Sequence, residues 1–182
     1  MKVRHRFRFY PDRRQSRALE KLFGCVRWTF NHALAARRHQ YQKTGQGLSY
    51  GESSAKLTQW KKEYPFLQNV SCVPLQQSLR HLQRAYVNFF EGRARYPTFK
   101  SRRARQSAEF TRSAFSWDQQ NESLSLAKIG RLRVRWSRVI KEWPSAVTIT
   151  KDCAGRWFVT LTLEEFRARL PETTASVGID WA

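Results

Sequence analysis

Acidic side chains are scarce in this sequence. It contains 14 Asp and Glu residues against 34 Lys and Arg, a formal net charge of +20 over 182 residues. Few partners other than a polyanion suit such an excess. The charge is also uneven, with a net +12 in residues 1–92, +10 in residues 93–141 and −2 in residues 142–182. We therefore expect the footprint of a polyanion to centre on about the first 140 residues.

Cysteine and histidine are also sparse. Cys25, Cys72 and Cys153 are far apart and form no CxxC pair, which argues against a disulfide framework and against a zinc site. The four histidines show no metal-binding spacing such as HExxH. We expect the three thiols to be free and buried, and we assign no chemistry to the histidines.

Long apolar runs are missing as well. No stretch approaches the roughly 18 apolar residues that span a bilayer, and the first residues lack the apolar core of a secretory signal. At 41% hydrophobic and 14% aromatic, the chain is still too rich in core-forming residues to be a disordered basic tail. We expect a folded, soluble, cytoplasmic protein with no membrane partner; its oligomeric state stays open.

Residues 2–10 alternate strictly between apolar and basic side chains, which predicts a strand with one buried and one cationic face. Asp12 is suited to cap a helix that runs to about Lys43. Further helices are expected at residues 52–64 and from Pro74 to near Gly92. The ordinary meaning of their apolar stripes is a mutual helix-bundle core.

After Gly92 a period of two returns, at residues 124–126, 131–136, 147–149 and 157–163. Residues 152–155 supply a turn that joins the last two strands as a hairpin. The first strand has no hairpin partner nearby, so the simplest topology adds it to this later sheet, with the helices inserted between. We predict an α+β fold in which an OB-like β-barrel, closed or partly open, is interrupted by a helical domain.

Residues 95–103 place two aromatic side chains among basic ones, in a segment kept from helix by Pro97. Rings and cations together can hold a flexible nucleic-acid strand, although the rings could equally anchor a solvated loop to the core. The candidate binding residues here are Arg95, Tyr96, Phe99, Lys100, Arg102 and Arg103.

Two strand faces each align three arginines about 6.6 Å apart, a spacing that suits successive phosphates. A solvated outer face is the alternative, but like charges in a row repel one another and rarely serve stability alone. We favour phosphate binding by Arg4, Arg6 and Arg8 and by Arg131, Arg133 and Arg135.

Asp180 ends a short apolar run, Val177-Gly178-Ile179, and a carboxylate in that position can present a first metal ligand. The pattern is weak alone, because two metal ions need several converging carboxylates.

The order of these blocks resembles the TnpB family of insertion-sequence proteins, which are relatives of the type V CRISPR effectors. The blocks are a lone first strand, a helical segment, RYPTFKSR at 95–102, LAKIGRLRV at 126–134, VTITKDCAGRWFVTLTLE at 147–164 and VGIDWA at 177–182. The resemblance spans essentially the whole chain. One departure is Ala182, where the family usually has glycine.

The resemblance implies an RNA-guided DNA endonuclease with guide RNA and target DNA as partners. It implies a wedge domain at residues 1–11 and 93–168, a helical recognition domain at 12–92, and a linker with the start of a RuvC nuclease domain of RNase H-like fold at 169–182. Asp180 matches the first of three acids that hold Mg²⁺ in the family, so we expect the chain alone to be nuclease-inactive and to hold no stable metal. A guide-independent DNA-binding regulator or transposition accessory protein is the main alternative. A ribosomal-type RNA-binding protein would fit the charge but not VGIDWA.

Overall fold

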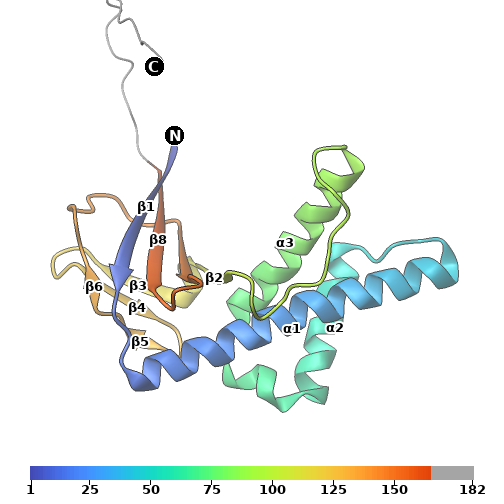
Figure 1. Ribbon diagram of the computed structural model, residues 1–182, viewed down its shortest axis with the longest axis horizontal. Helices are drawn as coiled ribbons and strands as arrows, with labels where there is room; N and C mark the ends of the chain where they lie inside the picture. The colour runs from blue at the N-terminus through green and yellow to red at the C-terminus, as the bar shows by residue number, and fades with distance from the viewer. Residues whose placement is uncertain (165–182) are drawn as a thin grey trace, which may run out of the picture.

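The computed structural model describes residues 1–164, which form an α+β structure (Figure 1). The expected linker and start of the RuvC domain at 169–182, with Asp180, lie outside the described residues. The helices are α1 (Arg13–Thr44), α2 (Tyr50–Glu63), the 3-10 helix η1 (Pro65–Asn69), α3 (Cys72–Phe90) and the 3-10 helix η2 (Arg112–Ala114). The strands are β1 (Lys2–Phe9), β2 (Gln106–Thr111), β3 (Phe115–Asp118), β4 (Ser123–Leu126), β5 (Gly130–Arg131), β6 (Val134–Arg135), β7 (Ala146–Lys151) and β8 (Trp157–Glu164).

The first strand joins the late sheet, as its lack of a hairpin partner predicted. β1 pairs antiparallel with β8 along its length, from Lys2 opposite Glu164 to Arg8 opposite Phe158, and its end also pairs with β6. Along the chain, all three α-helices therefore come between β1 and the later strands of the same sheet. In Figure 1, α2 and α3 lie to the right of the strands, and α1 begins below them. Phe7 and Phe9 are buried, whereas Arg4 and Arg6 on the alternate face are exposed and Arg8 is half-buried.

Local sequence sets the helix ends. Asp12 caps α1 through its side chain, which accepts a hydrogen bond from the backbone amide of Gln15 at 2.7 Å. The Gln15 side chain in turn accepts from the backbone amide of Asp12, which completes a capping box. Gly45 ends α1 in the left-handed conformation, with φ of 71°, which glycine adopts without strain. Ser49 and Glu52 form a second capping box at the start of α2. The three expected helices are confirmed, within a few residues at each end.

The strands form two sheets. One has five strands in the order β2-β7-β8-β1-β6, and the other has three in the order β3-β4-β5. The β7–β8 hairpin turns at residues 152–155, as predicted, with Gly155 at a φ of 74°. Among the described residues the sheets do not close into a barrel, because β2 and β6 remain edge strands.

The prediction of one continuous strand at residues 131–136 is wrong. Arg131 pairs with β4 in the three-stranded sheet, whereas Val134 and Arg135 pair with β1 in the five-stranded sheet. The chain crosses between the sheets in two residues, since the Leu132 amide donates to the Leu124 carbonyl and the Tyr10 amide to the Arg133 carbonyl. The side chains still alternate between exposed and more buried along residues 131–135, but the backbone pairs first with β4 and then with β1.

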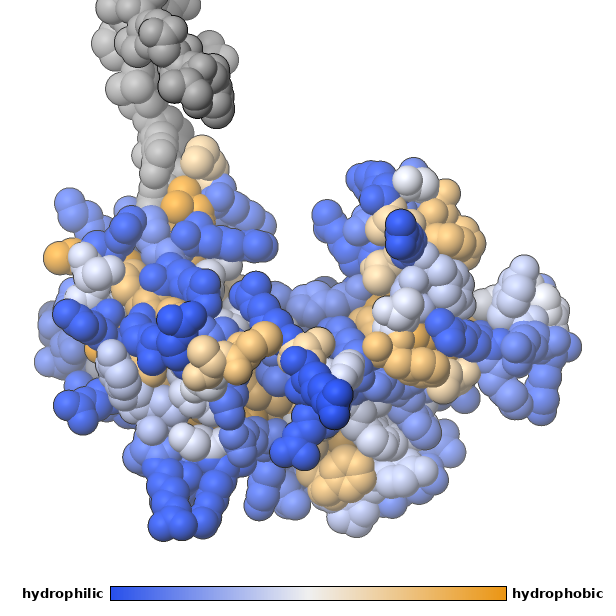
Figure 2. All heavy atoms as spheres, in the orientation of Figure 1, coloured by the Kyte–Doolittle hydropathy of each residue, from blue (hydrophilic) through white to orange (hydrophobic). Residues whose placement is uncertain are grey.

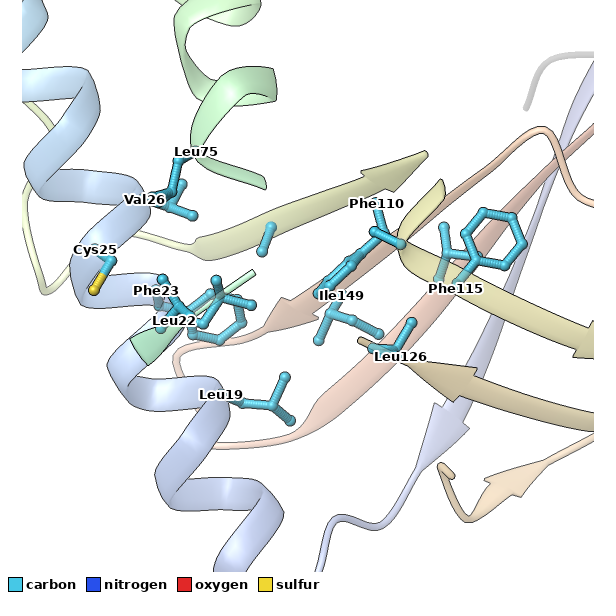
Figure 3. Packing of buried hydrophobic residues seen from close by; sticks show 14 of the residues in the cluster. Leu19, Leu22, Phe23, Cys25, Val26, Leu75, Phe110, Phe115, Leu126 and Ile149 are labelled. Carbon is cyan, nitrogen blue, oxygen red and sulfur yellow. The ribbon is translucent and has the colours of Figure 1, made fainter. Parts of the chain in front are cut away.

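One continuous core joins the sheets to the helices (Figure 3). Phe23 of α1 stacks on Trp157 of β8 with ring centroids 5.7 Å apart, and Val26 lies toward Leu75 of α3. The apolar side chains of α1 are thus buried against the sheet as well as against other helices. The core therefore includes the sheet in addition to the helix bundle that the sequence predicted. Burial of each such large side chain contributes about 1.5–3 kcal/mol.

Two cysteines differ from expectation. Cys25 is buried, and burial raises the pKa of its thiol, but Cys72 and Cys153 are exposed. Cys72 begins α3 and Cys153 sits in the β7–β8 turn, places where a small residue need not pack. No helix in the described part of the chain is long and apolar enough to cross a membrane.

Candidate nucleic-acid interface

The outer face of the five-stranded sheet carries a row of arginines. Arg4, Arg6 and Arg8 stand on β1 beside Thr162, Thr160 and Phe158 of β8, respectively. The Arg6 guanidinium lies 3.7 Å from the centre of the Phe158 ring, and that of Arg8 lies 5.2 Å from it. The ring supports both cations through cation–π attraction.

Only one arginine of the second predicted set joins this row. Arg135 lies directly opposite Arg8 in the register of β1 and β6, so their side chains share a face. Arg131 belongs to the other sheet, where its carbonyl accepts from the Gln15 side chain at 2.6 Å and fixes β5 to the start of α1. Arg133 lies in the crossing between the sheets. All three are exposed.

A carboxylate borders this face at its edge strand. Glu109 of β2 contacts His81 of α3, with 2.9 Å between the carboxylate oxygen and the ring nitrogen. This hydrogen bond, together with the charges of His81 and Arg4, lowers the pKa of Glu109 despite partial burial. The pair joins α3 to the sheet. Figure 2 shows a hollow between the part of the surface formed by the strands and the lobe built on α3.

The basic aromatic segment, residues 93–105, is fixed to α1. The Asn31 side chain exchanges two hydrogen bonds with the backbone of Lys100, at 2.8 and 3.0 Å. Arg38 donates to the Pro97 carbonyl at 2.9 Å. The side-chain amide of Gln106 donates to three main-chain carbonyls, those of Ser101, Arg102 and Ala104. The segment is thus ordered without any helix or strand of its own.

The rings of this segment combine the two roles considered from the sequence. The Arg38 guanidinium lies 5.1 Å from the Tyr96 ring and 4.9 Å from the Phe99 ring, which anchors both. Tyr96 is still 40% exposed and Phe99 52% exposed, so each ring also has a free surface. Lys100 is also exposed, but its ammonium lies 4.1 Å from the centre of the Phe30 ring, and partial desolvation there lowers its pKa.

The remaining cations of the segment are exposed. Arg95 follows the end of α3, and Arg102 and Arg103 line a cavity of about 390 Å³ with Arg27 of α1 and Lys151 of β7. Lys151 also pairs with Glu20 at 2.6 Å, so this cavity is not uniformly cationic. Lys100 differs from its three arginine neighbours because its ammonium lies over the ring of Phe30, a buried residue of α1.

A stronger basic cavity was missed from the sequence. Its volume is about 550 Å³, it has no acidic residue in its lining, and its cations are Arg13, Arg14, Arg17, Lys21 and Lys128. We call it the α1 basic pocket. The spacing of 13, 17 and 21 places three cations on one helix face, and that signal could have been noticed. Lys128 comes from the β4–β5 turn, which the sequence could not have placed there.

Ser71 also lines the α1 basic pocket, at the start of α3. The residue is 8% exposed, and its side chain does not cap the helix and has no hydrogen-bond partner among residues 1–164. Ser71 and the first amides of α3 can therefore serve a bound anion next to the four α1 cations.

Asp180 lies outside the described residues. Within residues 1–164, no three His, Cys, Asp or Glu side chains come together in a way that could hold a metal ion.

Comparison with known proteins gives a consistent set of matches. Residues 1–46 match the model of a family described as "Helix-turn-helix domain", HTH_OrfB_IS605. The chain is 50% identical over 181 residues to a "Putative RNA-guided DNA endonuclease" from Streptomyces pristinaespiralis, and 32% identical over 178 residues to one named InsQ from Escherichia coli (strain K12). Each alignment covers 96% of this chain and 44% of the relative. Half of the chain also matches 86% of the virulence protein VsdF of Salmonella dublin, at 29% identity.

Residues 1–46 contain one strand and one uninterrupted helix, so the described structure places no helix-turn-helix inside the matched range. The matched range instead supplies the β1 arginines and most cations of the α1 basic pocket. The chain spans less than half the length of the first two relatives. By these matches it belongs to the TnpB family.

Proposed function

We propose that this chain is the guide-RNA and DNA binding portion of a TnpB-like, RNA-guided DNA endonuclease. In this proposal the two sheets form the wedge-like part and α1 to α3 the helical recognition part. The names of the two longer relatives support the nuclease assignment.

The observation that carries the proposal is a set of surface cations that form no ion pair with a carboxylate of residues 1–164. Within residues 1–164, the side-chain ion pairs involve Lys2, His81, Arg93, Lys151 and Arg156. The β1 arginines and the cations of the α1 basic pocket form none there. Such concentrated positive charge destabilises a protein by self-repulsion unless a polyanion neutralises it.

Binding would follow from the positions of these groups. The β1 row, extended by Arg135, is suited to successive phosphates along a strand. The α1 basic pocket is suited to a single phosphate held by several cations, with the Ser71 hydroxyl as an additional donor. The exposed rings of Tyr96 and Phe99 can stack on bases.

The nuclease step belongs to residues that are not described. We propose that Asp180 is the first of three acids that hold Mg²⁺ in a RuvC domain, as the resemblance implies. The described residues gather no such acid set, so no catalytic step is derived from them. A protein with this role would act in the cytoplasm, where both nucleic acids are found.

A guide-independent DNA-binding regulator is the second candidate, and the family description "Helix-turn-helix domain" favours it. The two functions differ in whether the purified chain carries a bound RNA. The chain should be purified from its host, and the nucleic acid that accompanies it should be sequenced. We expect one defined small RNA, and its loss from the variant Arg4→Gln/Arg8→Gln with an unchanged circular dichroism spectrum.

The matched control is Arg156→Gln, which removes an arginine that already pairs with Asp152 at 2.6 Å. It should retain the RNA. Purification with DNA alone would support the regulator, and purification with no nucleic acid from any source would refute both functions.

A further inference from the structure

An aromatic pocket lies away from the arginine row, between the ends of α1 and α3. Its volume is about 470 Å³, and it is lined by Tyr41 of α1, by Tyr86, Phe89 and Phe90 of α3, and by Tyr96. Arg37 and Gln83 add polar groups to the lining, and residues 47–49 of the α1–α2 connection complete it. The lobe built on α3 shows several apolar patches on the face in Figure 2.

The rings are packed into a fixed wall. Tyr86 stacks against Phe90 with centroids 6.2 Å apart, and Tyr96 meets Phe89 edge to face at 5.1 Å. The hydroxyls of Tyr86 and Tyr96 are 3.0 Å apart, which ties the segment after α3 to the helix. Burial, together with this bond, raises the pKa of Tyr86, so its hydroxyl stays protonated.

A buried guanidinium provides the polar side of the pocket. Arg37 is 6% exposed, donates to the Ser53 hydroxyl at 3.3 Å and to the Gln83 side-chain oxygen at 2.5 Å, and lies 5.0 Å from the Tyr86 ring. These bonds use its Nε and Nη2. Its Nη1 and the Gln83 amide nitrogen have no hydrogen-bond partner among the described residues, so both remain available as donors.

The pocket is open to solvent at two of its rings. Phe90 is 77% exposed and Tyr41 63% exposed, which is costly for large apolar groups unless something covers them. The Arg38 guanidinium lies 5.1 Å from the Tyr96 ring, and the exposed Arg95 precedes that residue. An occupant with a flat apolar body, hydrogen-bond acceptors on its edge and negative charge beside it would match all three features.

We propose that this pocket accepts one unstacked nucleobase from the bound nucleic acid. Tyr41 and Phe90 would cover the faces of the base, and Arg37 with Gln83 would donate to the acceptors on its edge. The neighbouring phosphates would lie toward Arg38 and Arg95. The inference rests on the proposed nucleic-acid function and adds a base-binding subsite to it.

A fluorescent base analogue tests the subsite directly. The probe is a single-stranded oligothymidylate of about a dozen nucleotides with one central 2-aminopurine, whose emission falls when it stacks on a ring. We expect binding to quench it. Phe90→Ala should remove the quenching and weaken binding about fivefold to hundredfold, the range that corresponds to one lost stack.

Two controls separate a base contact from a general effect. Phe90→Tyr keeps a ring at the site and should keep the quenching. Phe66→Ala removes another exposed phenylalanine outside the pocket, 43% exposed, and should bind as the unaltered chain does. Both sites are at the surface, so folding should be preserved in each variant.

The outcomes are distinct. If Phe90→Ala binds and quenches like the unaltered chain, the subsite is wrong while the proposed function stands. If Phe90→Ala changes only self-association in sedimentation, the pocket is a protein contact and the inference is overturned. If the unaltered chain binds no nucleic acid of any kind, the proposed function fails and the subsite fails with it.

Discussion

Arg38 connects two parts of the molecule through a single side chain. It leaves α1, donates to the Pro97 carbonyl at 2.9 Å and lies over the rings of both Tyr96 and Phe99. Its Nε is buried without a hydrogen-bond partner among the described residues, so packing against the rings is a large part of its role. This contact holds the basic aromatic segment to α1 together with the two hydrogen bonds between the Asn31 side chain and the Lys100 backbone.

We predict that Arg38→Ala lowers the free energy of unfolding by about 2 kcal/mol, because it removes a charged hydrogen bond and two cation–π contacts. Urea unfolding followed by circular dichroism measures this change. Arg14→Ala is the matched control, since Arg14 is exposed and forms no contact of this kind. Equal stability of the two variants would show that Arg38 does not hold the segment.

The limits of sequence reasoning at this scale are visible in Lys100 and the cysteines. The composition of residues 95–103 showed aromatic rings among cations, but it gave no information on where each side chain would point. Lys100 points at Phe30 because the Asn31 side chain holds its backbone, a contact across 69 residues. Exposure of Cys72 and Cys153 likewise follows from where their helix and turn end up in the fold.

Elements with strong local signals were predicted well. Strict alternation identified β1, and a cap followed by a helical stripe identified α1 almost to the residue. β2 and β3 were missed because their alternating stretches are short and interrupted by η2. The division of residues 131–135 between β5 and β6 was also missed, because pairing partners, and not side-chain periodicity, determine which sheet a strand joins.

The start of α1 gives an element-scale prediction. Asp12→Ala removes an N-cap side chain and should lower the free energy of unfolding by about 1 kcal/mol. Asp12→Asn keeps an oxygen that can accept from the Gln15 amide and should cost only a few tenths of that loss. Thermal unfolding of the two variants makes the comparison. An equal loss in both would assign the effect of Asp12 to its charge near the helix start and not to the cap.

At the scale of the whole molecule, packing assembles what no single segment contains. The α1 basic pocket needs the start of α1, the residues before α3 and the β4–β5 turn, and the arginine row gains Arg135 only because β6 pairs with β1. Charge in the sequence predicted that a polyanion binds in the first part of the chain. Alternation also predicted the cationic face of β1, but neither signal could predict that cations from separate segments would collect in the α1 basic pocket or that Arg135 would join the β1 row.

The most direct measurement of nucleic-acid binding is its dependence on salt. Each phosphate neutralised on a duplex contributes about 0.9 to the slope of log affinity against log salt concentration. With roughly six contacts available, we predict a slope near −5 for the unaltered chain on a structured RNA. Arg13→Gln/Arg14→Gln/Arg17→Gln should make that slope shallower by about 2 to 3. A slope shallower than about −2, unchanged in the triple variant, would contradict the assignment of these cations to phosphate binding.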